Sequence, residues 1–205
     1  MSTRIRAATA ADIAAITAIY AHAVRFGTAS FEIDPPDAAE MGERFAVLAA
    51  GGFPYLVATT DTGIAGYAYA GPYRTRVAYR NTVEDSVYLD PQFHRQGIGR
   101  ALLDRLVAES EARGYRQMVA VIGDSGQASS IALHRAAGFR MVGTLAAVGH
   151  KFGHWIDTVL MQRPLGAGAT TGQFATRQSE RSMARSTRSS SGPRRTISPV
   201  AEMTL

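Results

Sequence analysis

Two closely spaced glycines between a strand-like run and a helix-like run constrain this chain most. Gly97 and Gly99 lie in the segment His94 to Ala101. The apolar run Ser86 to Leu89 comes before it and is closed by Asp-Pro, as at the end of a strand. After it, apolar residues recur at helical spacing. The glycines therefore open a helix, whose free first-turn N–H groups predict an anion site.

Two common nucleotide-binding loops do not fit this segment. A Rossmann loop needs a third glycine where this chain has Leu102, and a Walker A loop needs a lysine, whereas the only lysine, Lys151, is far away. What remains is a pyrophosphate site flanked by Arg95 and Arg100, whose guanidinium groups suit charge-assisted hydrogen bonds. A tight turn without a ligand is the alternative that the glycine pair leaves open.

The loop and a second motif together resemble the GNAT superfamily of N-acetyltransferases. Its acetyl-CoA loop reads Gln/Arg-x-x-Gly-x-Gly/Ala, and here His94 takes the first position. Its second signature, Asn-x-x-Ser/Ala-x-x-Leu-Tyr/His, is similar to Gln127 to His134, which Ala137-Gly138-Phe139 follows. Other stretches look like the phosphinothricin and methionine sulfone/sulfoximine N-acetyltransferases, namely 69–73, 83–88, 119–123 and 149–157. The resemblance covers roughly residues 3 to 165.

The periodicity predicts an α/β (α+β) chain in which strands meet about four helices. We expect a mixed, mostly antiparallel twisted sheet with a splayed parallel pair, where the helix after the glycine loop crosses over. The resemblance implies that this is the GNAT fold. The expected helices begin near 9, 37, 97 and 128, and the expected strands lie near 4–7, 55–59, 64–70, 84–89, 117–122, 141–148 and 155–163.

Composition divides the chain into an acetyltransferase domain, 1–165, and a basic Ser/Arg-rich tail, 166–205. The tail holds six arginines and two acidic residues, so most of the net charge of +5 belongs to it. Its lack of periodic apolar residues predicts disorder. We interpret the tail as a solvated extension and expect no nucleic-acid partner. The alternative class is a nucleic-acid-associated protein that binds through this basic tail. We expect truncation of the tail to leave turnover unchanged.

Other compositional features limit the environment and the chemistry. No apolar run approaches the ~20 residues of a membrane span, and no signal-peptide pattern is seen, so we expect a cytoplasmic protein without a membrane partner. The chain has no cysteine, which excludes a cysteinyl acyl-enzyme. Acyl transfer would then be direct.

The resemblance implies a catalytic base and suggests an acid. Glu84 matches the glutamate before Ser/Thr-Val-Tyr in the phosphinothricin acetyltransferases, where it would act as base through a water. Asp85 beside it would raise one of the two pKa values if the carboxyl groups interact, but neighbouring strand residues point to opposite faces. His134 stands where many members place a tyrosine near the sulfur of coenzyme A. It is a candidate general acid, with simple packing in the helix as the alternative.

The resemblance also implies the binding residues. The backbone edge of Val87, Tyr88 and Leu89 would pair with the pantetheine amides of acetyl-CoA like an added strand. The remaining expected cofactor contacts are the backbone N–H groups of Arg95, Gln96, Gly97, Ile98, Gly99 and Arg100, with Gln127, which replaces the usual Asn, and Ser130.

The sequence constrains the residues that bind the acceptor least of all. Arg74 and Arg76 are candidates for a substrate carboxylate, and Phe31 and Tyr79 for pocket walls; the alternative is solvated loop arginines. No metal is expected, because the histidines at 150 and 154 lack a third ligand at a suitable spacing.

These observations favour an acetyl-CoA-dependent N-acetyltransferase acting by direct attack on a small α-amino acid of the phosphinothricin or methionine sulfone/sulfoximine type. Detoxification would follow, because acetylation removes the charge of the ammonium group. The alternatives are acetylation of protein N-termini or other small amines, and a catalytically silent acetyl-CoA-binding module. The resemblance also implies a homodimer.

Overall fold

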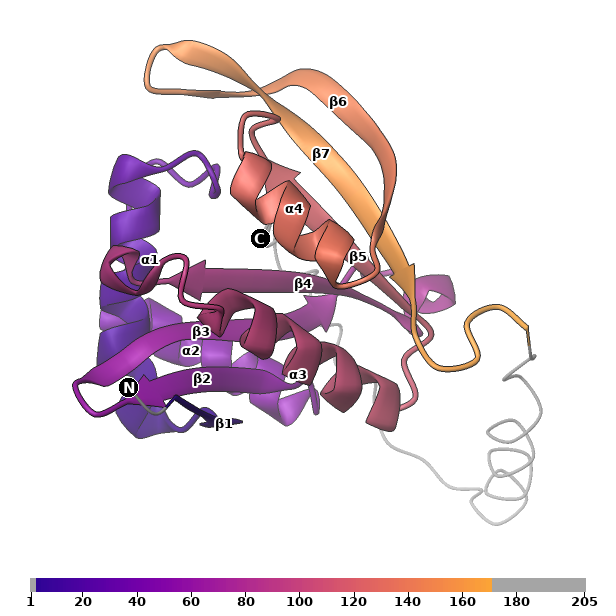
Figure 1. The fold of residues 1–205 in the computed structure, drawn as a ribbon, viewed down its shortest axis with the longest axis horizontal. Coiled ribbons are helices and arrows are strands. Elements are labelled where there is room, and N and C mark those ends of the chain that lie inside the picture. The colour runs from indigo at the N-terminus through magenta and orange to yellow at the C-terminus, as the bar shows by residue number, and fades with distance from the viewer. Residues whose placement is uncertain (1–2, 171–205) are drawn as a thin grey trace, which may run out of the picture. The chain divides into compact units, whose positions relative to one another are not determined.

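The computed structural model describes residues 3–170, in which one seven-stranded sheet runs in the order β1-β2-β3-β4-β5-β7-β6 (Figure 1). All neighbouring strands are antiparallel except β4 and β5, which are parallel. The strands are β1 Arg4–Ala7, β2 Tyr55–Thr60, β3 Gly63–Pro72, β4 Thr82–Leu89, β5 Gln117–Gly123, β6 Arg140–Lys151 and β7 His154–Pro164. The expected mixed sheet is therefore confirmed.

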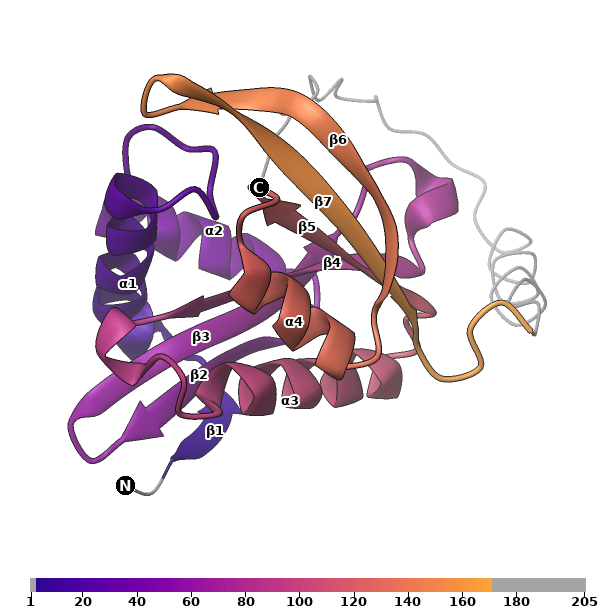
Figure 2. The same cartoon turned by 45° about the horizontal axis from the view of Figure 1, so that its top comes forward.

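Within the described residues, four α-helices cover the two faces of the sheet (Figure 2). Helices α1 (Ile13–Phe26) and α2 (Ala38–Ala50) pack on one face, and α3 (Ile98–Ala112) and α4 (Ala128–Ala136) pack on the other. Three short 3-10 turns, Ala10–Asp12, Val77–Tyr79 and Pro91–Phe93, connect elements of the described chain. Each expected helix and strand is present within a few residues. Most of the predicted tail, from residue 171 on, lies outside the described residues.

The pleat of β3 assigns different residues to the two cores. Tyr67 and Tyr69 point to the core under α1 and α2, whereas Ala68 and Ala70 point to the core under α3. The tyrosine rings stack on Tyr55 of the neighbouring strand, with centroids 5.9 and 5.0 Å away. Small side chains on the other face let α3 lie close against the sheet.

The parallel pairing of β4 with β5 is short. It runs from Thr82↔Gln117 to Asp85↔Ala120 and then stops, although both strands continue. The opposite edge of β4 stays paired with β3 as far as Leu89. The two parallel strands diverge beyond this point (Figure 1), as expected for a splayed pair.

The first helix is anchored by a buried carboxylate. Asp12 accepts hydrogen bonds from the N–H and hydroxyl of Thr9, at 2.8 and 3.0 Å, which forms a capping arrangement where a helix was expected to begin, near residue 9. It also binds Arg6 with two contacts of 2.7 Å. The Arg6 hydrogen bond is the main reason that the pKa of Asp12 falls to about 2. This carboxylate therefore ties β1 to α1.

No helix among residues 3–170 is long and apolar enough to cross a membrane.

The Asp12 contacts predict a pH-dependent contribution to stability. Because the pKa of Asp12 is lower in the folded chain than its unfolded value of about 3.9, its contribution is present above about pH 4 and is lost as the pH falls through 2. We expect Asp12→Asn to lower the free energy of unfolding by about 2 kcal/mol at neutral pH, and by progressively less in acid. Urea denaturation across this range measures the difference. Exposed Asp34→Asn is the control, and an equal loss in both variants contradicts the assignment.

Candidate active site

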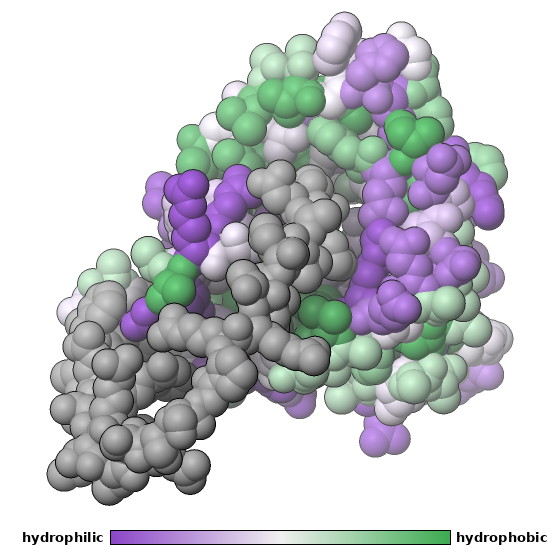
Figure 3. All heavy atoms as spheres, turned by 180° about the vertical axis from the view of Figure 1, so that it is seen from behind, coloured by the Kyte–Doolittle hydropathy of each residue, from purple (hydrophilic) through white to green (hydrophobic). Residues whose placement is uncertain are grey.

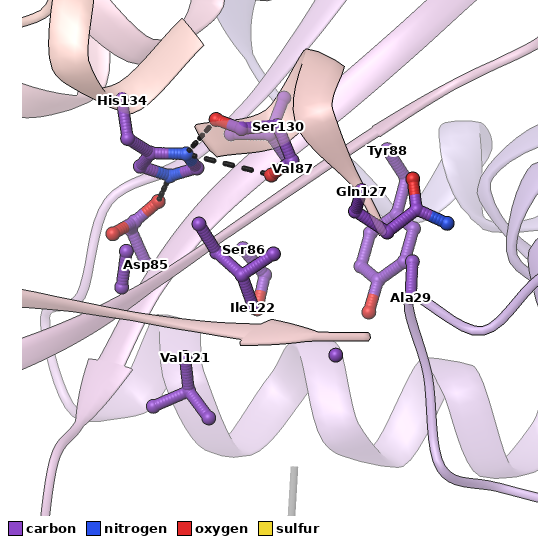
Figure 4. Close-up of a pocket in the computed structure, with 12 residues that line it drawn as sticks. Ala29, Asp85, Ser86, Val87, Tyr88, Val121, Ile122, Gln127, Ser130 and His134 are labelled. Atoms are coloured by element: carbon purple, nitrogen blue, oxygen red, sulfur yellow. Dashed lines mark hydrogen bonds and ion pairs between the residues drawn. The ribbon is translucent and has the colours of Figure 1, made fainter. Parts of the chain in front are cut away.

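A pocket lies where β4 and β5 separate (Figure 4). The free edge of β4 forms one wall, the end of β5 a second and α4 a third. Its lining residues are Ala29, Asp85, Ser86, Val87, Tyr88, Ala120, Val121, Ile122, Gly123, Gln127, Ser130 and His134. Of the residues expected at the site, it gathers Val87, Tyr88, Gln127, Ser130 and His134.

The glycine loop has the backbone shape of an anion cradle. Arg95 and Gly97 both adopt left-handed conformations, with φ of 60° and 78°, and Gly97 caps α3. Ala101 donates back to the carbonyl of Gly97, so the first-turn N–H groups before it have no acceptor within the helix. A Cβ on Gly97 would meet open space. Successive N–H groups in this geometry favour a bound anion.

The structure shows a packing role for Gly99 that the sequence did not reveal. It is buried, and a Cβ there would lie 3.2 Å from Leu89 and 3.6 Å from Leu133. Gly99 therefore allows α3 to pack against β4 and α4, and a contact from its N–H to an anion stays a prediction. Of the basic flanks, Arg100 forms a 2.6 Å ion pair with Asp104 on α3, while Arg95 is exposed.

Glu84 is a half-buried acid near the start of β4. Burial raises its pKa, the negative charge of Asp85 raises it further, Arg74 opposes this, and the result is a pKa of about 7. The two acids therefore interact through space although the pleat directs their side chains to opposite faces. Glu84 faces Tyr69 on the α1/α2 side, and Asp85 faces α4. A carboxyl group with this pKa can exchange a proton near neutral pH.

Both ring nitrogens of His134 have partners inside the protein (Figure 4). Nδ1 lies 2.8 Å from the carbonyl oxygen of Ser130, and Nε2 lies 2.9 Å from Oδ2 of Asp85. Burial opposes charge on the ring, but the hydrogen bond and charge of Asp85 outweigh it, and the pKa of His134 is raised. The histidine is thus an ion-paired group and not simply a packed helix residue.

Ser130, His134 and Asp85 superficially resemble a Ser-His-Asp triad. The hydroxyl of Ser130 is 3.5 Å from Nδ1, yet the carbonyl oxygen of the same residue is closer, at 2.8 Å. A carbonyl only accepts, so Nδ1 must carry a proton and cannot take one from the hydroxyl. This arrangement does not generate a serine nucleophile.

The residues expected to bind the acceptor lie in two places. Arg74 reaches toward Glu84, and its guanidinium group lies 4.8 Å from the Tyr73 ring centroid. Tyr79 packs edge-on against the same ring, while Arg76 is exposed and shares their segment between β3 and β4. Phe31 lies elsewhere, in the loop between α1 and α2, with its ring close over the backbone of the β6–β7 hairpin and the end of β5.

Gln127 is held by the α1–α2 loop. Its side-chain N–H donates to the hydroxyl of Thr28 at 3.1 Å, and that hydroxyl donates to Asp124 at 2.7 Å. The amide therefore bridges the start of α4 to the loop that carries Ala29 into the pocket. A contact from Gln127 to pantetheine stays a prediction.

Lys151 is a residue whose role at the site the sequence did not reveal. It lies at the end of β6, is 3% exposed, and its ammonium group donates to the carbonyls of Gly27 and Ser30 at 3.0 and 2.8 Å. The α1–α2 loop, with Ala29 and Phe31, is thereby fastened to the β6–β7 hairpin. The signal available was that this single lysine lies in a motif shared with the resembling group.

The motif around Lys151 does not gather metal ligands. His154 contacts the carbonyl of Phe152, His150 packs on Trp155, and Asp157 accepts from Ser125 and from a backbone N–H. Across residues 3–170, no group of three or more His, Asp or Glu side chains is placed to hold a metal ion.

Comparison with known proteins identifies the family. Residues 5–160 match the acetyltransferase (GNAT) domain. A phosphinothricin N-acetyltransferase of Alcaligenes faecalis is 58% identical over 160 residues, which cover 78% of this chain and 81% of the relative. An L-methionine sulfoximine/L-methionine sulfone acetyltransferase of Pseudomonas paraeruginosa is 42% identical, covering 79% and 94%. The chain belongs to the GNAT acetyltransferase family.

A solved structure of this family supports the same assignment of donor. The GNAT superfamily phosphinothricin acetyltransferase of Sinorhizobium meliloti in complex with acetyl-CoA has a TM-score of 0.83 and 48% identity, and the match covers 86% of this chain and 95% of that one. The protein is an acetyl-CoA-dependent N-acetyltransferase.

The buried lysine of this GNAT protein gives a testable prediction. Lys151→Met keeps much of the side-chain volume but leaves the carbonyls of Gly27 and Ser30 without their donor, so we expect a loss of about 2 kcal/mol in the free energy of unfolding. We also expect faster amide hydrogen exchange in 27–32. Arg140→Met, an exposed cation on the same strand, is the matched control. Equal stability of the two variants contradicts the tether.

Proposed function

We propose that this protein transfers the acetyl group of acetyl-CoA to the α-amino group of a small amino acid of the phosphinothricin or methionine sulfone/sulfoximine type. The names of the relatives at 58% and 42% identity support this acceptor class. The observation that carries the mechanism is the position of Glu84, a half-buried acid with a pKa of about 7, on the strand whose free edge lines the pocket.

The donor occupies the opening between β4 and β5 in this proposal. Backbone groups of 87–89 are unpaired toward β5 and can hydrogen-bond to an extended ligand as an added strand does. The left-handed loop at 95–97 and the first turn of α3 would hold the pyrophosphate, with Gln96, Ile98, Gly99 and Arg100 completing the loop. Gln127 and Ser130 would contact the pantetheine arm from α4.

The reaction needs the acceptor amine in its neutral form. Glu84 takes a proton from the ammonium group, directly or through a water, and the nitrogen lone pair then attacks the thioester carbonyl carbon. The new C–N bond forms, the C–S bond breaks, and coenzyme A leaves as a thiolate. The nitrogen then releases its second proton to water, which leaves a neutral amide. Because the chain has no cysteine to accept the acetyl group, both substrates would be bound at once. His134 would line the part of the pocket that binds acetyl-CoA.

The acceptor approaches from the side of Glu84. Arg74, whose positive charge favours the ionised form of Glu84, would bind the substrate carboxylate. Arg76 would be a second cation, and Tyr79 would lie beside them. Phe31, 39% exposed above the hairpin, would form an apolar wall. Acetylation would remove the positive charge of the amine, which would inactivate a toxic amino acid that requires it.

We further propose that two copies associate through β6. This strand forms one edge of the sheet, and its exposed side chains include Met141, Val142, Leu145 and Val148. Hydrophobic residues gather along the rim where the β6–β7 hairpin lies (Figure 3). An exposed apolar edge strand is a surface that natural proteins usually pair or cover.

An amine panel tests the proposed acceptor. Release of coenzyme A thiol from acetyl-CoA is measured with phosphinothricin, methionine sulfone, methionine sulfoximine, free methionine, a polyamine and a peptide with a free N-terminus. We expect the highest kcat/KM with the first three. Preference for the peptide or polyamine would favour the alternative acceptors, and acetyl-CoA binding without turnover would favour a silent binding module.

The role of Glu84 predicts a specific pH dependence. Since a base must be deprotonated, kcat/KM of the wild-type protein should rise as the pH increases through about 7. Glu84→Gln should lose about 10²–10⁴-fold in kcat/KM and lose this rise, while acetyl-CoA still binds. The exposed variant Glu43→Gln is the control. Full activity of Glu84→Gln would remove it as the base.

A further inference from the structure

The hydrogen bonds of His134 determine its protonation state. The carbonyl oxygen of Ser130, 2.8 Å from Nδ1, can only accept, so Nδ1 carries a proton. Oδ2 of Asp85 lies 2.9 Å from Nε2, and a proton shared by a carboxyl group and an imidazole resides on the imidazole, the stronger base, so Nε2 carries one as well. A ring that donates from both nitrogens is an imidazolium. The contacts therefore describe a charged histidine.

The surroundings keep this ring in place. The side chains of His134 and Asp85 are 6% and 1% exposed. Phe139 packs edge-on against the imidazole with a centroid distance of 5.1 Å. His134 also lies in the last turn of α4, where the helix dipole favours a positive charge. The ring cannot turn without breaking two hydrogen bonds and this packing.

The charge of Asp85 depends on His134 in return. Oδ1 of Asp85 is buried and has no hydrogen-bond partner within the described part of the chain, so the imidazolium is the group that compensates this carboxylate. Arg74, from the segment after β3, and Tyr69, from β3, interact electrostatically with Glu84, and neither is among the groups that shift the pKa of His134. Asp85 therefore interacts both with Glu84, the proposed base, and with the charged ring of His134.

We propose that Asp85 is a positioning residue that holds His134 as a permanent imidazolium on the pocket wall. The ring then supplies a fixed positive charge to the donor side and does not pass a proton to the departing thiolate. A thiol has a pKa of about 8.5, so a thiolate can leave near neutral pH without a proton from the enzyme. The catalytic consequence rests on the proposed function, whereas the protonation state does not.

The protonation state can be measured directly. Long-range ¹H–¹⁵N NMR of the full chain distinguishes neutral from doubly protonated imidazole, and His134→Gln identifies the signal among five histidines. We expect His134 to be doubly protonated at pH 7 in the wild type, because Asp85 raises its pKa. In Asp85→Asn the amide can donate to a bare Nε2, so the ring should be neutral at pH 7. Exposed Asp61→Asn should change nothing.

The pH profile separates positioning from a merely structural role. Removing the charge of Asp85 also lowers the proton affinity of Glu84, so the rise of kcat/KM with pH should move to lower pH in Asp85→Asn, by about one unit. Asp85→Glu should restore the imidazolium signal and return the profile toward the wild type. A uniform loss of kcat/KM without a shift of its pH profile would indicate that Asp85 has only a structural role. That result would overturn the catalytic part of the proposal.

Two results would overturn the proposal outright. One is a neutral His134 in the wild type near pH 7, which needs no variant and holds even if Asp85→Asn does not fold. The other is a doubly protonated ring in folded Asp85→Asn. Full activity of Glu84→Gln would instead remove the proposed base and leave the NMR result standing.

Discussion

The site depends on a backbone pairing that ends early. Parallel hydrogen bonding between β4 and β5 stops at Asp85 and Ala120, while β3 holds the other edge of β4 through Leu89. The free edge is therefore rigid without being occupied by a neighbouring strand. Its unpaired N–H and C=O groups are what an extended amide-containing ligand can recognise. The pocket, the glycine loop and the two acids all take their positions from this divergence.

The pleat of β4 gives two adjacent acids different environments. Glu84 has its pKa raised by burial on the side of α1 and α2, while Asp85 is paired with a cation on the side of α4. Two carboxyl groups one residue apart are thereby made chemically unequal. Such unequal environments are how one site holds both a proton acceptor and a fixed charge at the same pH.

Local sequence patterns predicted the elements and the glycine loop well, because strand alternation, helical periodicity and caps are set by neighbours along the chain. Thr9 and Asp12 are one example, and Gly97 is another. The tertiary roles were harder to predict. His134 meets Asp85 across 49 residues, and Lys151 reaches carbonyls more than 100 residues earlier. The packing role of Gly99 was missed for the same reason, since its neighbours Leu89 and Leu133 come from other elements.

The burial of Lys151 has a consequence for a protein that handles an activated thioester. Acetyl-CoA acylates exposed lysine amines without a catalyst when the amine is neutral and reachable. Here the only lysine of the chain is 3% exposed and donates to two carbonyls, and every other basic side chain in the sequence is arginine or histidine. The protein therefore presents no accessible lysine to its own substrate, so that self-inactivation through lysine acetylation has no surface target.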